Sequence, residues 1–237
     1  MTRRVTQTLC ILAAGIAAVG DGVADDIDLV LRAESDWMYH GFSEFRGQPA
    51  VGLTVDWQSD SPIFVGASVA QVVDDERVRR PTSGTYYIGA GWAVSDQVFV
   101  SGAFQHRDFP GSLGEWDYQE YELQLDAALS SVSRLIVRAD YADDYYSVDA
   151  SALGAEVDYA RQLDDRFYGF ATIGAIRFSE NTRIPNYEYG QLGVGLRVSS
   201  LTIDLALRLN SESSETRIGS EPFSDREWVL RFAWQAL

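Results

Sequence analysis

Two histidines and one run of acids are the residues of this chain best suited to chemistry. His40 and His106 are the only histidines, and a histidine acts as a general base in ester hydrolysis when a nucleophilic serine lies beside it. Phe104 and Asp108, not serines, stand two residues from His106, and the chain has no G-x-S-x-G motif. A histidine near a strand end is usually a polar rim residue. We therefore predict no catalytic residues and no enzyme.

The run Asp74-Asp75-Glu76 is a candidate cation site, because several carboxylate oxygens suit a hard divalent cation. Acidic runs of this kind more often form a solvated loop. The sequence therefore predicts no bound metal and no cofactor.

The overall charge excludes one class of partner. The 237 residues carry 19 basic and 35 acidic side chains, which gives a formal net charge of -16 and a pI near 4.4. Such a charge repels nucleic acid. The hydrophobic content of 46% is high enough for an ordered domain. All basic residues are arginine, which either ion pairing between strands or codon composition explains.

Residues 1–24 have the organisation of a secretory signal peptide. Arg3 and Arg4 precede a largely apolar stretch at 5–19, and small residues at 22–24 offer a cleavage site. The stretch is too short for a membrane-spanning helix. Cleavage removes Cys10, the only cysteine, so the mature domain at 25–237 contains no disulfide.

Large apolar side chains alternate with small or polar ones throughout the mature chain. Residues 201–209 read Leu-Thr-Ile-Asp-Leu-Ala-Leu-Arg-Leu, with an aliphatic residue at every odd position. A period of two places alternate side chains on opposite faces of a strand. The pattern predicts an all-β domain of twelve strands, at 27–41, 48–58, 62–73, 85–94, 97–107, 116–129, 133–143, 147–162, 166–178, 187–198, 201–211 and 224–236.

The connections between these strands are short and long in turn. The turns at 59–61, 95–96, 130–132, 163–165 and 199–200 are rich in Ser and Asp, which bond their own backbone. Longer loops follow at 42–47, 74–84, 108–115, 144–146, 179–186 and 212–223. An even number of antiparallel strands with this asymmetry is typical of a bacterial outer-membrane barrel. We predict a transmembrane, up-and-down β-barrel in the cell outer membrane, with both termini in the periplasm.

The positions of aromatic residues distinguish a membrane barrel from the alternative, a secreted soluble β-protein. Trp and Tyr gather at both ends of the apolar stripe in membrane barrels. The predicted interfacial girdle consists of Trp37, Tyr39, Trp57, Tyr86, Trp92, Tyr121, Tyr141, Tyr159, Trp228 and Trp234. The aromatic final strand predicts recognition by the outer-membrane insertion machinery, and outer-membrane lipid is the expected environment.

Charged residues gather on the opposite, inward face. By strand parity eleven acids and six arginines point inward: Asp28, Arg32, Glu34, Asp36, Asp56, Glu120, Glu122, Asp126, Arg138, Asp140, Glu156, Asp158, Arg177, Arg197, Asp204, Arg208 and Arg231. All except Asp28, Asp36, Glu120 and Arg177 are predicted to line the lumen. This excess of acids predicts a porin-like passage for small solutes with a preference for cations. A non-conducting structural or adhesive barrel and an outer-membrane lipid-modifying enzyme are the alternatives.

The start of the mature chain resembles a known family. Residues 35–43 (SDWMYHGFS), 46–57 (RGQPAVGLTVDW) and 63–68 (IFVGAS) resemble the SxYxxRGxSQ, GxPAVQxGxDY and FYxGxW motifs of the TorF-type porins. His40 stands where that family has Arg, and Glu44 stands where it often has Gln. The resemblance implies an outer-membrane barrel of undefined substrate, and it supplies no catalytic residue.

Overall fold

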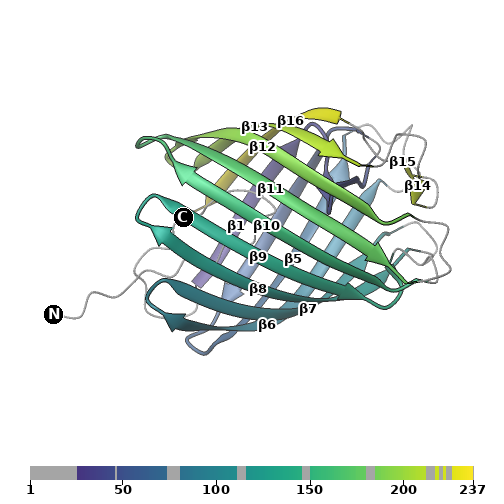
Figure 1. Cartoon of the computed structure of the whole chain (residues 1–237), viewed down its shortest axis with the longest axis horizontal. Coiled ribbons are helices and arrows are strands. Elements are labelled where there is room, and N and C mark those ends of the chain that lie inside the picture. Colours follow the sequence, from purple (N-terminus) through teal and green to yellow (C-terminus); the bar gives the residue numbers. More distant parts are fainter. Residues whose placement is uncertain are drawn as a thin grey trace.

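The computed structural model of the chain describes residues 26–45, 47–73, 81–110, 116–145, 150–179, 185–211, 217–218, 221–222 and 226–236. Within these residues, twelve antiparallel strands form a closed barrel (Figure 1), which confirms the predicted fold class. The described part of the chain contains no helix that is long and apolar enough to cross a membrane. The predicted signal peptide at 1–24 and the acidic run at 74–76 lie outside the described residues.

Each barrel strand pairs with the strands that precede and follow it, and β1 closes the ring against β16. The barrel strands are β1 (Asp26–Glu34), β4 (Ala50–Gln58), β5 (Ile63–Val72), β6 (Thr82–Ser95), β7 (Val98–Asp108), β8 (Tyr118–Ser130), β9 (Ser133–Ala142), β10 (Ala152–Gln162), β11 (Phe167–Phe178), β12 (Tyr187–Val198), β13 (Leu201–Asn210) and β16 (Arg226–Ala236). Two small hairpins accompany them, β2 (Met38–Tyr39) with β3 (Phe42–Ser43) and β14 (Arg217–Ile218) with β15 (Glu221–Pro222).

The short turns gather at one end of the barrel and the long connections at the other, as the sequence predicts. The first strand begins at this short-turn end, and the last strand ends there (Figure 1). The first strand differs most from the prediction. The strand expected at 27–41 ends at Glu34, because the chain leaves the wall there and does not return to it until Ala50.

The distribution of side chains is the reverse of that in a soluble protein. Leu123, Leu205 and Trp228 are exposed on the outside, with 59, 45 and 64% of their surface accessible. Charged residues such as Glu120 and Asp140 are buried inside, with 1 and 4% accessible. Such a belt of exposed apolar side chains favours hydrocarbon over water as the surrounding medium. The outer face is therefore the face of a membrane barrel.

Tyrosines on the inner wall lie over glycines of the neighbouring strands. Tyr87, Tyr168 and Tyr189 are the register partners of Gly66, Gly195 and Gly174, and a Cβ atom at any of these glycines would collide with the tyrosine ring. Each tyrosine ring therefore packs against the inner wall, over the backbone of the neighbouring strand. Each hydroxyl donates a hydrogen bond to an inward acid: Tyr87 to Asp56, Tyr168 to Asp204 and Tyr189 to Glu156.

Candidate functional site: the barrel interior

A cavity of about 1110 Å³ occupies the barrel. At the short-turn end it reaches turn residues such as Asp60, Asp96 and Asp165. At its other end the lining includes Met38, Tyr39, His40 and Gly41 of the first long connection. The cavity therefore extends from the short-turn mouth to a segment of the chain that lies inside the barrel.

Most predicted lumen residues line this cavity. These are Arg32, Glu34, Asp56, Glu122, Asp126, Arg138, Glu156, Asp158, Arg197, Arg208 and Arg231. Asp140 and Asp204 are also inside, but they are buried behind other side chains and do not line the cavity. Arg177 was expected to point inward and does not. It lies on the outer face and pairs with Glu188 at 2.7 Å, because the inner face of β11 is formed by the alternate residues, which include Tyr168 and Phe170.

One side of the wall, on β8 to β10, holds several carboxylates and two arginines, Arg134 and Arg138. Arg138 forms ion pairs with Glu156 and, at 2.8 Å, with Asp158, while its Nε donates to Gln124 at 3.2 Å. Asp126 pairs with Arg134. A guanidinium group suits this role because its donors diverge and can reach two carboxylates at once.

The opposite side of the ring, on β1, β13 and β16, holds arginines around one carboxylate. Glu34 lies 3.2 Å from Arg32, 2.8 Å from Arg231 and 3.9 Å from Arg208. Arg231 also lies 3.6 Å from Asp204. The lumen wall is therefore more basic on this side and more acidic on the side of β8 to β10.

The inward loop, residues 35–45 and 47–49, folds into the lumen at the long-loop end. Its tip is the β2–β3 hairpin, where His40 and Gly41 have φ angles of 46° and 75°. A two-residue hairpin turn with positive φ at both positions matches the twist of its strands. Ser43 donates a hydrogen bond to Asp36 at 2.5 Å and accepts one from the backbone N–H of Gly47 at 2.7 Å, which braces the base of the hairpin.

The inward loop is anchored to several strands at once. Arg107 on β7 pairs with Glu44 and lies 3.6 Å above the ring of Tyr39. The hydroxyl of Tyr39 donates to Glu120 on β8, and Asn210 on β13 donates to the carbonyl of Gly41 at 2.9 Å. This number of contacts makes the loop a part of the folded barrel interior.

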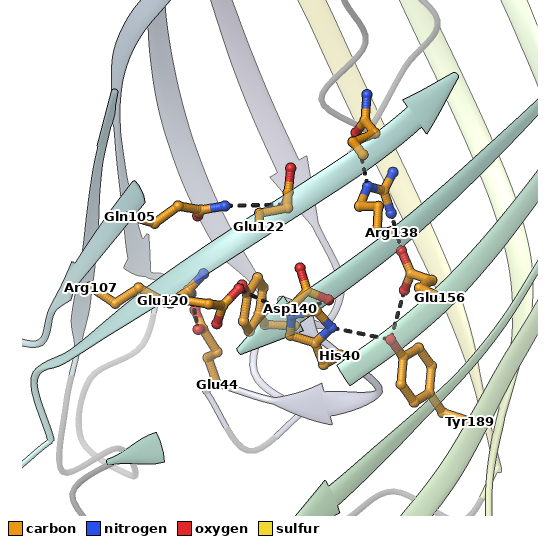
Figure 2. Close-up of polar contacts among 12 residues, drawn as sticks. His40, Glu44, Gln105, Arg107, Glu120, Glu122, Arg138, Asp140, Glu156 and Tyr189 are labelled. Carbon is orange, nitrogen blue, oxygen red and sulfur yellow. Dashed lines mark hydrogen bonds and ion pairs between the residues drawn. The ribbon is translucent and has the colours of Figure 1, made fainter. Parts of the chain in front are cut away.

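His40 occupies the centre of these contacts (Figure 2). Its Nε2 lies 3.6 Å from Glu120 and 4.0 Å from Asp140, and its Nδ1 lies 3.2 Å from the hydroxyl of Tyr189. Burial alone would lower the pKa of His40, but the two carboxylates outweigh burial and raise it to about 9. The position therefore favours a positive charge.

An apolar cluster covers the hairpin on the side away from the cavity. It consists of Phe42, Phe109, Tyr118, Ala142, Tyr145, Ala152, Ile176 and Tyr187. None of these described residues lines the cavity. The hairpin and this cluster therefore lie inside the barrel at its long-loop end.

Two of the ten predicted girdle residues are inside the barrel, so their assignment was wrong. Trp37 is 7% accessible and lies under Arg32, with 3.8 Å between the guanidinium carbon and the ring centre. Tyr39 is held by Glu120 and Arg107. Both belong to the inward loop, where outward strand parity no longer applies.

The other eight girdle residues lie on barrel strands. Seven are exposed, and Trp57 is half-buried beside the cavity mouth. The exposed residues are Tyr86, Trp92, Tyr121, Tyr141, Tyr159, Trp228 and Trp234.

The comparisons with known proteins agree on the fold. No family model and no curated protein sequence matches the chain, so the resemblance to the TorF-type porins rests on the sequence motifs alone. Among solved structures, the chain is similar to the NanC porin, with a TM-score of 0.63, 8% identity, and coverage of 88% of this chain and 100% of that one. It is also similar to the KdgM porin, with a TM-score of 0.59, 7% identity, and coverage of 89 and 98%.

A third similar structure is an outer membrane channel from Pseudomonas putida F1, with a TM-score of 0.50, 10% identity, and coverage of 91 and 96%. The identities are low, so the likeness concerns the fold. The chain has the fold of an outer-membrane, porin-like β-barrel.

Proposed function

We propose that this protein is an outer-membrane channel for passive passage of small solutes, with a preference for cations. After removal of the signal peptide at 1–24, the domain at 25–237 inserts with both termini in the periplasm. The cavity supports this proposal, because a polar lumen that begins at one mouth of a lipid-facing barrel suits permeation and has no role in a purely structural wall. Membership of the TorF-type family is part of the proposal and rests on the motifs at 35–43, 46–57 and 63–68.

The preference for cations rests on inward acids that have no arginine partner. Among the described residues, Asp28, Asp56 and Glu122 form no ion pair with an arginine, and neutral Gln235, Tyr87 and Gln105 donate to them instead. Asp28 and Asp56 are register partners on β1 and β4. Adjacent carboxylates without a cationic partner lower the energy of a cation in a narrow lumen and raise that of an anion.

The inward loop favours a second candidate, a non-conducting barrel. The loop and the apolar cluster lie inside the barrel at the long-loop end, so permeation requires the loop to move or a path to remain beside it. Because the cavity reaches the short-turn mouth, we propose a channel that the loop narrows rather than a non-conducting barrel. The KdgM porin, to which this fold is similar, has been solved in complex with oligogalacturonate, a solute bound by that protein.

Planar-bilayer recording of the purified protein tests the proposal. Discrete conductance steps, with a reversal potential displaced toward the cation in a salt gradient, are the expected result. A bilayer that stays silent at all voltages would favour the structural barrel. Silence together with release of fatty acid from added phospholipid would favour the lipid-modifying enzyme.

A further inference from the structure

Three buried side chains lie close together inside the barrel, and each has at least one polar atom without a hydrogen-bond partner in the described structure. They are His40 from the hairpin, Glu120 from β8 and Asp140 from β9, whose side chains are 7, 1 and 5% accessible. Nε2 of His40, Oε2 of Glu120 and both carboxylate oxygens of Asp140 lack a hydrogen-bond partner within the described structure. Leaving several such atoms buried costs free energy unless a further group satisfies them.

The hydrogen bonds around His40 determine which nitrogen faces the carboxylates. The hydroxyl of Tyr189 donates its proton to Glu156 at 2.8 Å. The Tyr189 oxygen can therefore only accept from His40, so Nδ1 carries a hydrogen and donates to it across 3.2 Å. The other nitrogen, Nε2, lies on the side of Glu120 and Asp140 (Figure 2), and in the neutral imidazole it carries the lone pair.

These atoms repel one another unless a cation lies between them. One donor atom from each of the three side chains can be chosen so that all three atoms lie within 4.8 Å of one another. A proton on Nε2 is one way to supply the charge. However, the separations of 3.6 Å to Glu120 and 4.0 Å to Asp140 exceed hydrogen-bond distances, and both oxygens of Asp140 would stay unsatisfied.

We propose that His40, Glu120 and Asp140 bind one divalent transition-metal cation of the Zn²⁺ class. One imidazole nitrogen and two carboxylate oxygens form a donor set that suits Zn²⁺, which takes such ligands at about 2.0–2.2 Å. Small movements of the three side chains toward their common centre bring the atoms to that distance. A hard cation such as Ca²⁺ prefers a set of oxygens alone.

The surrounding residues are those that commonly support metal ligands. A metal-binding histidine usually donates its second ring N–H to a nearby acceptor, as His40 does to Tyr189. The hydroxyl of Tyr39 likewise holds Oε1 of Glu120. Both contacts fix the orientation of a ligand, so the site is formed before the metal arrives.

The cation would connect the hairpin to two strands of the wall. His40 belongs to the inward loop, whereas Glu120 and Asp140 belong to neighbouring barrel strands. Binding of Zn²⁺ therefore stabilises the closed position of the loop. The metal site itself does not rest on the proposed channel function. Only the predicted effect of the metal on conductance rests on that function.

Isothermal titration calorimetry with zinc chloride tests the site. The mature barrel is refolded in detergent and stripped with EDTA, and its folding is checked by heat modifiability on a gel. We expect one Zn²⁺ per barrel, and no such binding in His40→Ala or Asp140→Asn. The matched control is His106→Ala, which removes the other histidine, on the outer side of β7, and should bind like the wild type.

Tyr189→Phe provides a variant that retains all three ligands. It removes the acceptor for the His40 N–H, and we expect affinity for Zn²⁺ to fall about 10- to 100-fold. Binding that persists in His40→Ala would overturn the proposal. So would a folded wild-type protein that binds no Zn²⁺. In that case, a His40 imidazolium detected by NMR at neutral and mildly alkaline pH would show that a proton occupies the site.

Bilayer recording separates this inference from the proposed function. If the barrel conducts, added Zn²⁺ should lower its open probability and EDTA should restore it, with no response in His40→Ala. Stoichiometric binding of Zn²⁺ by a silent barrel would support the metal site and contradict the channel.

Discussion

Arg107 on β7 and Glu44 in the inward loop form a buried ion pair, with 6 and 0% of their side chains accessible. The two residues lie on different elements, so the pair joins the loop to the barrel wall. Removing one partner of a buried pair leaves an uncompensated charge and typically costs about 3–5 kcal/mol. The pair is therefore a principal contact that holds the loop in the lumen.

We expect Arg107→Ala to release the inward loop. Residues 25–237 contain no cysteine, so in a protein of this span Ser43→Cys supplies a single, nearly isosteric thiol at a buried position of the hairpin. Thiol labelling should be slow in this background and about 100-fold faster when Arg107→Ala is added, as a loss of about 3 kcal/mol implies. With His106→Ala as the matched control, equal labelling rates in all three proteins would show that the pair does not hold the loop.

A charge on the outer face should destabilise the barrel in a membrane. Leu205 is 45% accessible and lies between Val194 and Leu230 on neighbouring strands. Leu205→Arg near the middle of the strand should cost about 2–4 kcal/mol in urea unfolding from lipid vesicles. Leu205→Phe, which keeps the side chain apolar, should stay close to the wild type. Wild-type stability in Leu205→Arg would mean that this face does not contact lipid.

Neutralising the unpaired inward acids should weaken cation selectivity. The triple variant Asp28→Asn, Asp56→Asn and Glu122→Gln removes three carboxylates that form no ion pair with an arginine in the described structure and retains the shape of each side chain. The reversal potential in a salt gradient should move toward zero, and the wild-type selectivity itself should weaken at high salt because ions screen the fixed charges. An anion-selective wild type, or an unchanged triple variant, would exclude this mechanism.

Rising pH should loosen the base of the inward loop. Burial and the neighbouring carboxylate of Glu227 raise the pKa of Asp36 to about 8, against the opposing effects of Ser43 and Arg208. An unfolded Asp has a pKa of about 3.9, so the folded form binds more protons than the unfolded form between these values. The stability of the loop therefore falls as pH rises from about 4 to about 8.

Asp36→Asn should remove this component of the pH dependence. The amide oxygen can still accept from Ser43, and the residue no longer ionises. Labelling of the Ser43→Cys thiol is unsuitable here because the thiol itself titrates, so protease cleavage of the loop at several pH values between about 4 and 8 is the measurement. Identical pH profiles for the wild type and Asp36→Asn would contradict the role assigned to Asp36.

The alternation of side chains was sufficient to predict the barrel wall. At residues 201–209 apolar and polar residues alternate without interruption, and β13 has the expected faces, with Leu205 outside and Asp204 inside. Alternation failed for Arg177, because both faces of β11 carry aromatic residues and parity alone does not say which face is inside.

The inward loop could not be predicted from alternation. The alternation of inward and outward positions continues without a break through Glu34, Asp36, Trp37 and Tyr39. The sequence pattern therefore does not reveal where the chain leaves the barrel wall. His40-Gly41 is a weaker turn signal than Asn-Gly, although both sites require positive φ. The contacts of His40 with Glu120 and Asp140 depend on the position of the folded loop, and these residues are far apart in the sequence.

Single-channel recording of the wild type beside Arg107→Ala tests the central claim most directly. This variant removes the arginine that pairs with Glu44, and the loss of about 3 kcal/mol favours release of the loop from the lumen. We predict discrete, cation-preferring openings in the wild type, and larger or more frequent openings in Arg107→Ala as the loop leaves the lumen. An Arg107→Ala variant that folds and inserts but shows the same openings, or the same silence, as the wild type would contradict the claim that this barrel is a channel restricted by its first loop.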